Sequence, residues 1–152
     1  MGESLINYWG AHQFCGHSAG SRPHGKVHPL TLELLRDVGL PTEGLRSKSW
    51  TEFAAPGARP LDFVFTVCDN AAREVPPSWP GQPVTAHWGV DDPAALNFTQ
   101  VETWLAFSQA FKALENRVKL FANLPIATLT RSSLQAWADA IGNANPDDAD
   151  TV

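Results

Sequence analysis

The sequence is poor in cysteine, in charge and in long apolar segments. Its 152 residues include only 2 cysteines, too few for the disulfide framework of a small secreted protein. Charged residues make up 18% of the chain, against the ~25% typical of globular proteins, while 43% of the residues are hydrophobic. This composition excludes a disordered chain and a coiled coil. It predicts one globular domain whose core needs neither disulfides nor metal.

Two classes of partner are excluded by further absences. The 11 basic residues are scattered and outnumbered by 16 acidic ones, so the chain lacks the basic face that binds nucleic acid. No apolar stretch approaches the ~18 residues that span a bilayer, and the first ten residues lack the regions of a signal peptide. We therefore expect a cytoplasmic protein with reduced thiols and no membrane partner.

Helical and strand patterns alternate along the chain, which is typical of an α/β domain with a mainly parallel sheet. Apolar runs predict strands at 63–67 and 84–88, and a short strand is expected at 14–21. A long proline-rich loop is predicted at 69–83. Helices are predicted at 2–9, at 29–38, from a Ser49/Glu52 capping box, from 97 or 99 to 121, and from Ser132 or Ser133 to Gly142.

Helical spacing also predicts which side chains are buried. In the two C-terminal helices the expected core residues are Val101, Trp104, Leu105, Phe111, Leu114, Val118, Phe121, Leu134, Trp137, Ala138 and Ile141. We expect residues 1–142 to form the domain and residues 143–152, NANPDDADTV, to form an acidic flexible tail.

Four segments carry a resemblance to a known family. They are Ser18 to Ser21 (SAGS), Leu45 to Ser49 (LRSKS), Phe65 to Ala71 (FTVCDNA) and His87 to Ala94 (HWGVDDPA). In this order they resemble arsenate reductases built on the low-molecular-weight protein tyrosine phosphatase fold. The resemblance implies a three-layer α/β/α domain with a small parallel sheet, whose central first strand we expect to be missing from this chain.

The nucleophile of that family has no counterpart in the sequence. In the family, a Cys, five residues and an Arg form an anion-binding loop just before the segment that matches Met1 to Leu5. Here Ser21 lies six positions after Cys15, and Glu74 six positions after Cys68. An oxyanion needs converging backbone N–H groups and an arginine fork, and a thiolate held there attacks its central atom. We expect the chain as given to be inactive, and a native product that starts upstream.

The resemblance assigns roles to Asp92 and Cys68. Asp92 matches the general acid that protonates the departing oxygen, although Asp before Pro also favours a plain turn. Cys68 matches the second redox cysteine, which attacks the arseno-cysteine adduct, forms a disulfide and releases arsenite. The simpler interpretation of Cys68 is a small buried thiol at the end of a strand. The stretch Val75 to Pro77 replaces a further cysteine of three-cysteine relatives.

No bound cofactor is expected, and an external reductant is implied: thioredoxin, glutaredoxin or a small thiol. Glu3 and Ser18 match residues that bind potassium in some relatives, whereas Ser49 replaces an Asp of that site. A second group of metal-binding residue types lacks the usual ligand spacing, and we expect surface residues there: His12, Cys15, His17, His24 and His28.

The sequence therefore predicts an arsenate reductase-like protein for arsenic detoxification, with arsenate or phosphate as its ligand. The alternative is a non-catalytic pseudoenzyme or interaction module, in which the strands near Ala19 and Phe65 pair directly or two copies dimerise through open strand edges. A third hypothesis is a protein tyrosine phosphatase. It ranks below the reductase because phosphatases do not need Cys68.

Overall fold

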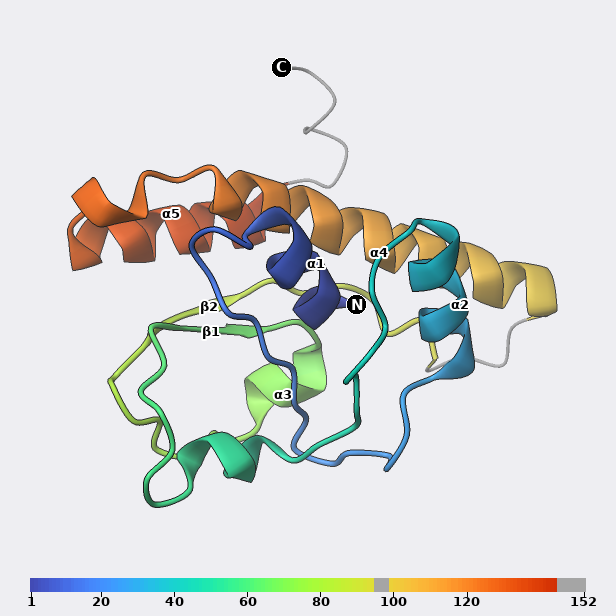
Figure 1. Ribbon diagram of the computed structural model, residues 1–152, viewed down its shortest axis with the longest axis horizontal. Coiled ribbons are helices and arrows are strands. Elements are labelled where there is room, and N and C mark those ends of the chain that lie inside the picture. Colours follow the sequence, from blue (N-terminus) through green and yellow to red (C-terminus); the bar gives the residue numbers. More distant parts are fainter. Residues whose placement is uncertain (95–98, 145–152) are drawn as a thin grey trace.

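The computed structural model describes residues 1–94 and 99–144 (Figure 1). None of the helices in these ranges is long and apolar enough to cross a bilayer. The elements are α1 (Gly2–Trp9), α2 (Pro29–Asp37), the 3₁₀ helix η1 (Trp50–Ala54), β1 (Phe63–Thr66), α3 (Asp69–Arg73), β2 (Val84–His87), α4 (Gln100–Ala122), the 3₁₀ helix η2 (Ile126–Thr128) and α5 (Arg131–Asn143).

Two parallel strands form the sheet of the described residues. Their register sets Phe63 beside Val84 and Thr66 beside His87. Residues of β2 alternate between buried and exposed, whereas all four residues of β1 are half-buried. In the described part of the chain, β1 has a neighbouring strand on one side only.

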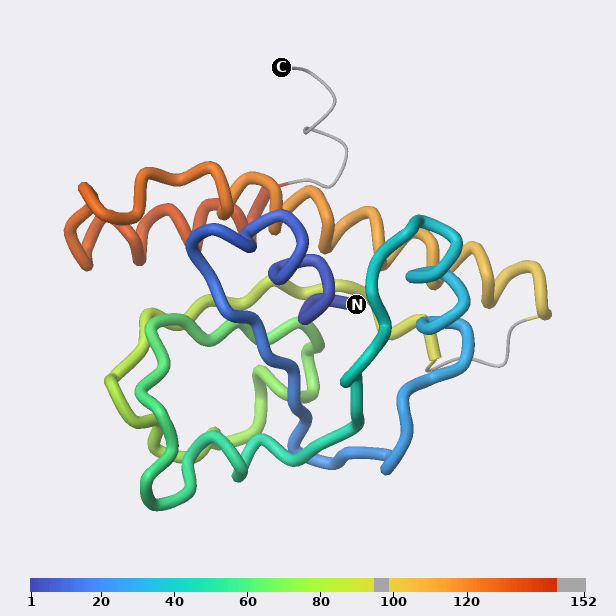
Figure 2. The backbone as a smooth tube through the Cα atoms, in the orientation of Figure 1, coloured from blue at the N-terminus to red at the C-terminus, as the bar shows by residue number. Residues whose placement is uncertain are grey.

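The helices are distributed over both sides of this sheet. Figure 1 shows α4 and α5 side by side along one side of the strands, where α1 packs against α4. The short helix α3 lies on the other side of the strands (Figure 1). The backbone trace in Figure 2 shows the path from β1 through α3 and back to the start of β2. The predicted α/β class with a small parallel sheet is confirmed.

Aromatic rings fill the space between the sheet, α1 and α4. The rings of Phe65 and Trp88 stack with 3.8 Å between centroids. Phe121 of α4 meets Phe63 and Phe65 edge-on at 4.9 and 5.1 Å, and Phe14 stacks on Phe121 at 4.8 Å. Aromatic pairs in these geometries stabilise a core beyond the area that they bury. This cluster anchors β1 although β1 is paired on one side.

The strand predicted at 14–21 does not form. Its backbone makes a single bridge, in which Gly20 bonds to the segment around Ser49 rather than to β1, so the direct pairing of Ala19 with Phe65 is also wrong. The side-chain amide of Asn7 accepts the backbone N–H of Gly16 at 2.8 Å and donates to the carbonyl of Gly16 at 2.9 Å. These bonds tie the segment to α1, because an amide side chain can replace a neighbouring strand as hydrogen-bond partner.

The loop predicted at 69–83 begins instead with a helix, α3. Cys68 caps this helix, since its sulfur accepts the N–H of Ala71 at 3.4 Å. Asp69 lies in its first turn and Arg73 in its last, which matches the helix dipole. Pro76 follows soon after and keeps the helix short.

The predicted burial of α4 is correct in its C-terminal half and wrong at its start. Phe111, Leu114, Val118 and Phe121 are buried, whereas Val101, Trp104 and Leu105 are 78%, 50% and 49% exposed. Figure 1 shows the first turns of α4 extending past α2. Periodicity predicts an apolar face, but the neighbouring elements determine how much of it is covered.

The start of α5 lies earlier than predicted. Thr130 caps the helix by accepting the N–H of Ser133 at 3.2 Å, so neither Ser132 nor Ser133 is the cap. The predicted start is wrong because three neighbouring hydroxyl residues offer equivalent caps.

The end of α5 also differs from its prediction. Gly142 lies inside the helix, and a Cβ there would overlap the carbonyl oxygen of His87. Because Gly142 has no side chain, α5 can pack closely on β2 at this position. Gly142 does not end the helix. Ala138 and Ile141 are buried as predicted, but Trp137 is half exposed. Of the predicted tail, residues 145–152 lie outside the described residues.

Candidate functional site

Cys68 and Asp92 leave the sheet at the same edge. Strand pairing continues past β1 and β2, because Trp88 N–H donates to Thr66 at 2.7 Å and Val90 N–H donates to Val67 at 2.8 Å. Cys68 follows directly after Val67, and Asp91-Asp92 follow directly after Val90. The carboxyl ends of neighbouring parallel strands are where α/β proteins bind ligands. The fold thus brings together two segments that lie 24 positions apart.

The thiol of Cys68 is half-buried and free. Its sulfur accepts the backbone N–H of Ala71. This contact with a backbone donor differs from the simple apolar burial of most free cysteines. Its role as a redox thiol stays a prediction.

Asp92 is exposed, and its Oδ1 accepts the N–H of Ala94 at 2.9 Å. This contact forms the turn that the Asp-Pro dipeptide favours. The second carboxylate oxygen makes no bond to another described residue that would orient it. Asp92 as general acid stays a prediction.

Arg117 of α4 supports the segment that leads to Asp92, and the sequence analysis missed it. Its Nη1 donates to the carbonyls of Trp88 and Gly89 at 3.2 and 2.9 Å. Arg117 is 7% exposed, and this burial lowers the pKa of its guanidinium. The signal was its position between Leu114 and Phe121 on the apolar face of the helix.

Glu3 and Ser18 meet, as the resemblance implied, and Lys48 joins them. Glu3 Oε2 accepts the hydroxyl and the N–H of Ser18 at 2.6 and 2.9 Å, and the ammonium of Lys48 at 2.9 Å. Burial alone would raise the pKa of Glu3, but these hydrogen bonds and the Lys48 charge lower it. The ammonium already neutralises this carboxylate. The arrangement therefore fits an ammonium better than an alkali ion, and the potassium site stays a prediction.

Ser49, the third residue of the implied potassium site, has other contacts. Its hydroxyl accepts the N–H of Thr51 at 3.3 Å and caps η1. The predicted capping box with Glu52 does not form, because Arg46 holds both oxygens of Glu52 at 3.0 and 2.6 Å. These two bonds lower the pKa of Glu52.

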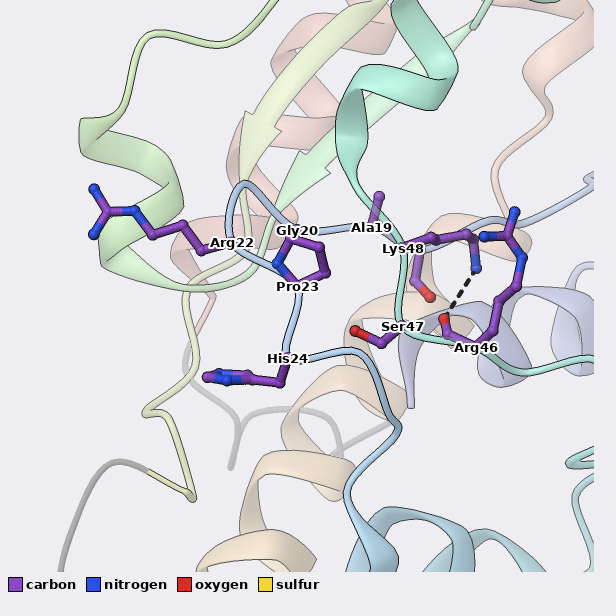
Figure 3. A pocket seen from close by; sticks show the side chains of 9 residues that line it. Ala19, Gly20, Arg22, Pro23, His24, Arg46, Ser47 and Lys48 are labelled. Atoms are coloured by element: carbon purple, nitrogen blue, oxygen red, sulfur yellow. Dashed lines mark hydrogen bonds between the residues drawn. The ribbon is translucent and has the colours of Figure 1, made fainter.

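A basic pocket of about 240 Å³ lies beside these groups, between the segments 18–24 and 46–48. Figure 3 shows its labelled side chains, with Arg22 reaching toward α3 and Arg46 and Lys48 on the opposite wall. Its lining contains no acidic residue: Ser18, Ala19, Gly20, Arg22, Pro23, His24, Arg46, Ser47 and Lys48. Its three Arg and Lys side chains each already have a carboxylate partner: Arg46 pairs with Glu52, Lys48 with Glu3, and Arg22 with Glu74 at 4.0 Å.

The remaining cluster of metal-binding residue types is dispersed. Cys15 Sγ lies 3.6 Å from His17 Nε2, and neither residue belongs to a strand. Across residues 1–94 and 99–144, no three His, Cys, Asp or Glu side chains are grouped so that they could hold a metal ion.

Comparison with known proteins gives a consistent result. Residues 1–134 match the family described as low molecular weight phosphotyrosine protein phosphatase. Proteins named arsenate reductase from Halalkalibacterium halodurans and Bacillus subtilis are each 32% identical over 106 residues, which is 70% of this chain and 73% of theirs. The arsenate reductase of Shouchella clausii is 30% identical over 122 residues, 80% of this chain and 84% of that protein.

Proposed function

The chain belongs to the low-molecular-weight phosphotyrosine protein phosphatase family, and on that premise we propose that it acts in the thiol-dependent reduction of arsenate to arsenite. Its similarity to proteins named arsenate reductase supports this branch of the family. The same family membership and similarity support an oxyanion as the substrate.

The observation that carries the proposal is the shared exit of Cys68 and Asp92 from the carboxyl edge of the sheet. Asp92 is the general acid that protonates an oxygen leaving arsenic. Cys68 is the second thiol. Its thiol is free and only half-buried, and the contact with the Ala71 N–H holds the sulfur in one position, which supports this role.

The reaction proceeds in two thiol steps. A first cysteine thiolate attacks arsenic(V), and a protonated oxygen leaves as water with the proton from Asp92. The Cys68 thiolate then attacks the sulfur of the adduct, so the S–As electron pair passes to arsenic. Arsenic(V) becomes arsenic(III) and leaves as arsenite, while the two sulfurs become a disulfide. An external dithiol or small thiol reduces this disulfide.

The first cysteine must be supplied with its loop. None of the 152 residues provides a Cys followed six positions later by Arg, so this polypeptide alone should not turn over arsenate. Val75 to Pro77 contain no third cysteine for an internal relay. The electrons therefore come from thioredoxin, glutaredoxin or a small thiol in a reducing compartment such as the cytoplasm.

The experiment compares the 152-residue chain with a version extended at its N-terminus by a strand and a Cys-x5-Arg loop. Each is assayed for arsenite formation with thioredoxin, glutaredoxin and glutathione. Only the extended chain should be active, Cys68→Ser should abolish turnover, and Asp92→Asn should lower kcat by about 10²-fold or more. Cys15→Ser, the matched thiol control, should retain activity. Full activity of Cys68→Ser, or enzyme-like rates in the 152-residue chain, would contradict the proposal.

A non-catalytic module is the second candidate, favoured by the partly uncovered β1 and the missing loop. It predicts that the extended chain also fails to reduce arsenate and that the 152-residue chain forms stable dimers in light scattering. Hydrolysis of p-nitrophenyl phosphate by the extended chain with Cys68 intact, without arsenate reduction, would instead indicate a phosphatase.

A further inference from the structure

The imidazole of His87 bridges the two sides of Cys68. His87 is the last residue of β2, and its Nδ1 lies 2.8 Å from the hydroxyl of Thr66, the last residue of β1. Its Nε2 lies 3.1 Å from Oδ1 of Asp69, the first residue of α3. Thr66 precedes Cys68 by two positions and Asp69 follows it directly. One side chain thus holds both ends of the segment that carries the thiol.

The two contacts are complementary in hydrogen-bond direction. A carboxylate only accepts, so Nε2–H donates to Asp69, and Nδ1 is then free to accept the Thr66 hydroxyl proton. A neutral imidazole therefore satisfies both partners. The side chains of His87 and Asp69 are 41% and 71% exposed. This contact is accessible to water and can open without unfolding the core.

The surroundings of His87 fix the imidazole in this position. A Cβ on Gly89 would lie 2.6 Å from His87 Nε2, so a residue with a side chain would displace the ring or move the backbone. On the other side, Gly142 of α5 packs against the carbonyl oxygen of His87. Gly89 thus leaves the space that the imidazole occupies, and Gly142 lets α5 pack closely on the backbone of His87.

We propose that His87 is a positioning residue for Cys68: by joining Thr66 to Asp69 it holds the thiol in its capping position on α3. The inference rests on the proposed role of Cys68 as the second thiol, and deepens it. With His87 in place, the sulfur stays half-buried against the Ala71 N–H. When the bridge opens, the first turn of α3 loosens and the thiol becomes more accessible but less well directed.

The test measures alkylation of Cys68 by iodoacetamide under native conditions, read by peptide mass spectrometry. Cys15, which is exposed, reports reagent activity in the same molecules. Thr66→Val removes the hydroxyl and keeps the shape, and it should raise the Cys68 rate about fivefold, the factor expected from one ordinary hydrogen bond. Thr66→Ser keeps a hydroxyl at this position, so Cys68 in this variant should be alkylated at the wild-type rate. His87→Phe should act like Thr66→Val, with the Cys15 rate unchanged.

Denaturant unfolding of each variant separates positioning from simple stability. A lower unfolding free energy for Thr66→Val with an unchanged rate of Cys68 alkylation would overturn the inference. A rate of Cys68 alkylation in Thr66→Ser as high as that in Thr66→Val would also overturn it. Should His87→Phe fail to fold, the Val/Ser pair at Thr66 still decides.

The extended chain then distinguishes this inference from the proposed function. There Thr66→Val should lower kcat for arsenate reduction about fivefold while KM stays constant. The lost hydrogen bond directs Cys68 in a step that follows substrate binding. If Cys68→Ser retains full activity, the proposed function fails even when the alkylation rates follow the expected order. If only the alkylation rates fail to change, the proposed function stands and His87 has no positioning role.

Discussion

The ammonium of Lys48 lies 2.9 Å from Oε2 of Glu3, although 45 positions separate the two residues. Both side chains are largely buried, with 5% of Lys48 and 14% of Glu3 exposed. The pair joins α1 to the segment that forms one wall of the basic pocket. A buried ion pair of this kind contributes to stability only while both partners are present.

Replacing Glu3 with Gln should destabilise the protein in a pH-dependent way. The folded pKa of Glu3 is below its unfolded value, so its contribution is fully present above a pH of about 4.3. It is lost as the pH falls through the lower folded value. At pH 7 the loss should be about 3 kcal/mol, because Lys48 stays buried without its carboxylate.

Urea unfolding of wild type and Glu3→Gln at pH 7, 5 and 3 checks this expectation. The difference between the two proteins should be largest at pH 7 and smallest at pH 3. Glu43→Gln, at an exposed position, is the control and should change little at any pH. A difference that is constant from pH 7 to pH 3 would contradict the assigned role of Glu3.

Replacing Lys48 with Met should create a dependence on potassium. In the wild type the ammonium neutralises Glu3, so Tm should be the same in KCl and in NaCl of equal concentration. In Lys48→Met, the oxygens of Glu3 and Ser18 no longer contact an ammonium and can bind a potassium ion. KCl should therefore raise Tm above its value in NaCl by about 2 °C or more. Calorimetry in the two salts measures the difference. Selective stabilisation of the wild type by potassium would show that the ammonium does not exclude the ion.

Arg117 should contribute strongly to stability through the two carbonyls that it holds. Arg117→Met removes the donors to Trp88 and Gly89 and should cost about 2 kcal/mol, since buried carbonyls then lack partners. Arg117→Lys keeps a donor and should cost less. Urea unfolding gives both values, with Arg36→Met at an exposed position as control. Equal stability of the Met variant and the wild type would exclude this role.

Gly142→Ala should destabilise the protein although alanine is the better helix former. Helix propensity alone favours Ala by about 1 kcal/mol, but the new Cβ would overlap the carbonyl oxygen of His87. The expected net cost is about 1–3 kcal/mol, as for other overpacked sites. Gly2→Ala is the matched control, because Gly2 is also helical and nothing lies within 4 Å of a Cβ there. Thermal unfolding of both variants gives the sign.

The sequence determined those features that depend on neighbouring residues. The helix predicted at 29–38 forms as Pro29–Asp37, with His28 as its cap, because proline and capping groups act within one turn. The apolar runs at 63–67 and 84–88 predicted β1 and β2 and their parallel pairing. The motifs around Cys68 and Asp92 identified the family from the sequence.

The features that join distant segments depend on how the whole chain packs. Asn7 competes with a strand for the backbone of Gly16, so the segment predicted as a strand does not form one. The first turns of α4 lie beyond α2, so Trp104 is half exposed despite its helical spacing. The contacts of Lys48, Arg117 and His87 each connect elements that no local pattern relates. Burial and pairing depend on which surfaces meet, and that is fixed when the whole chain packs.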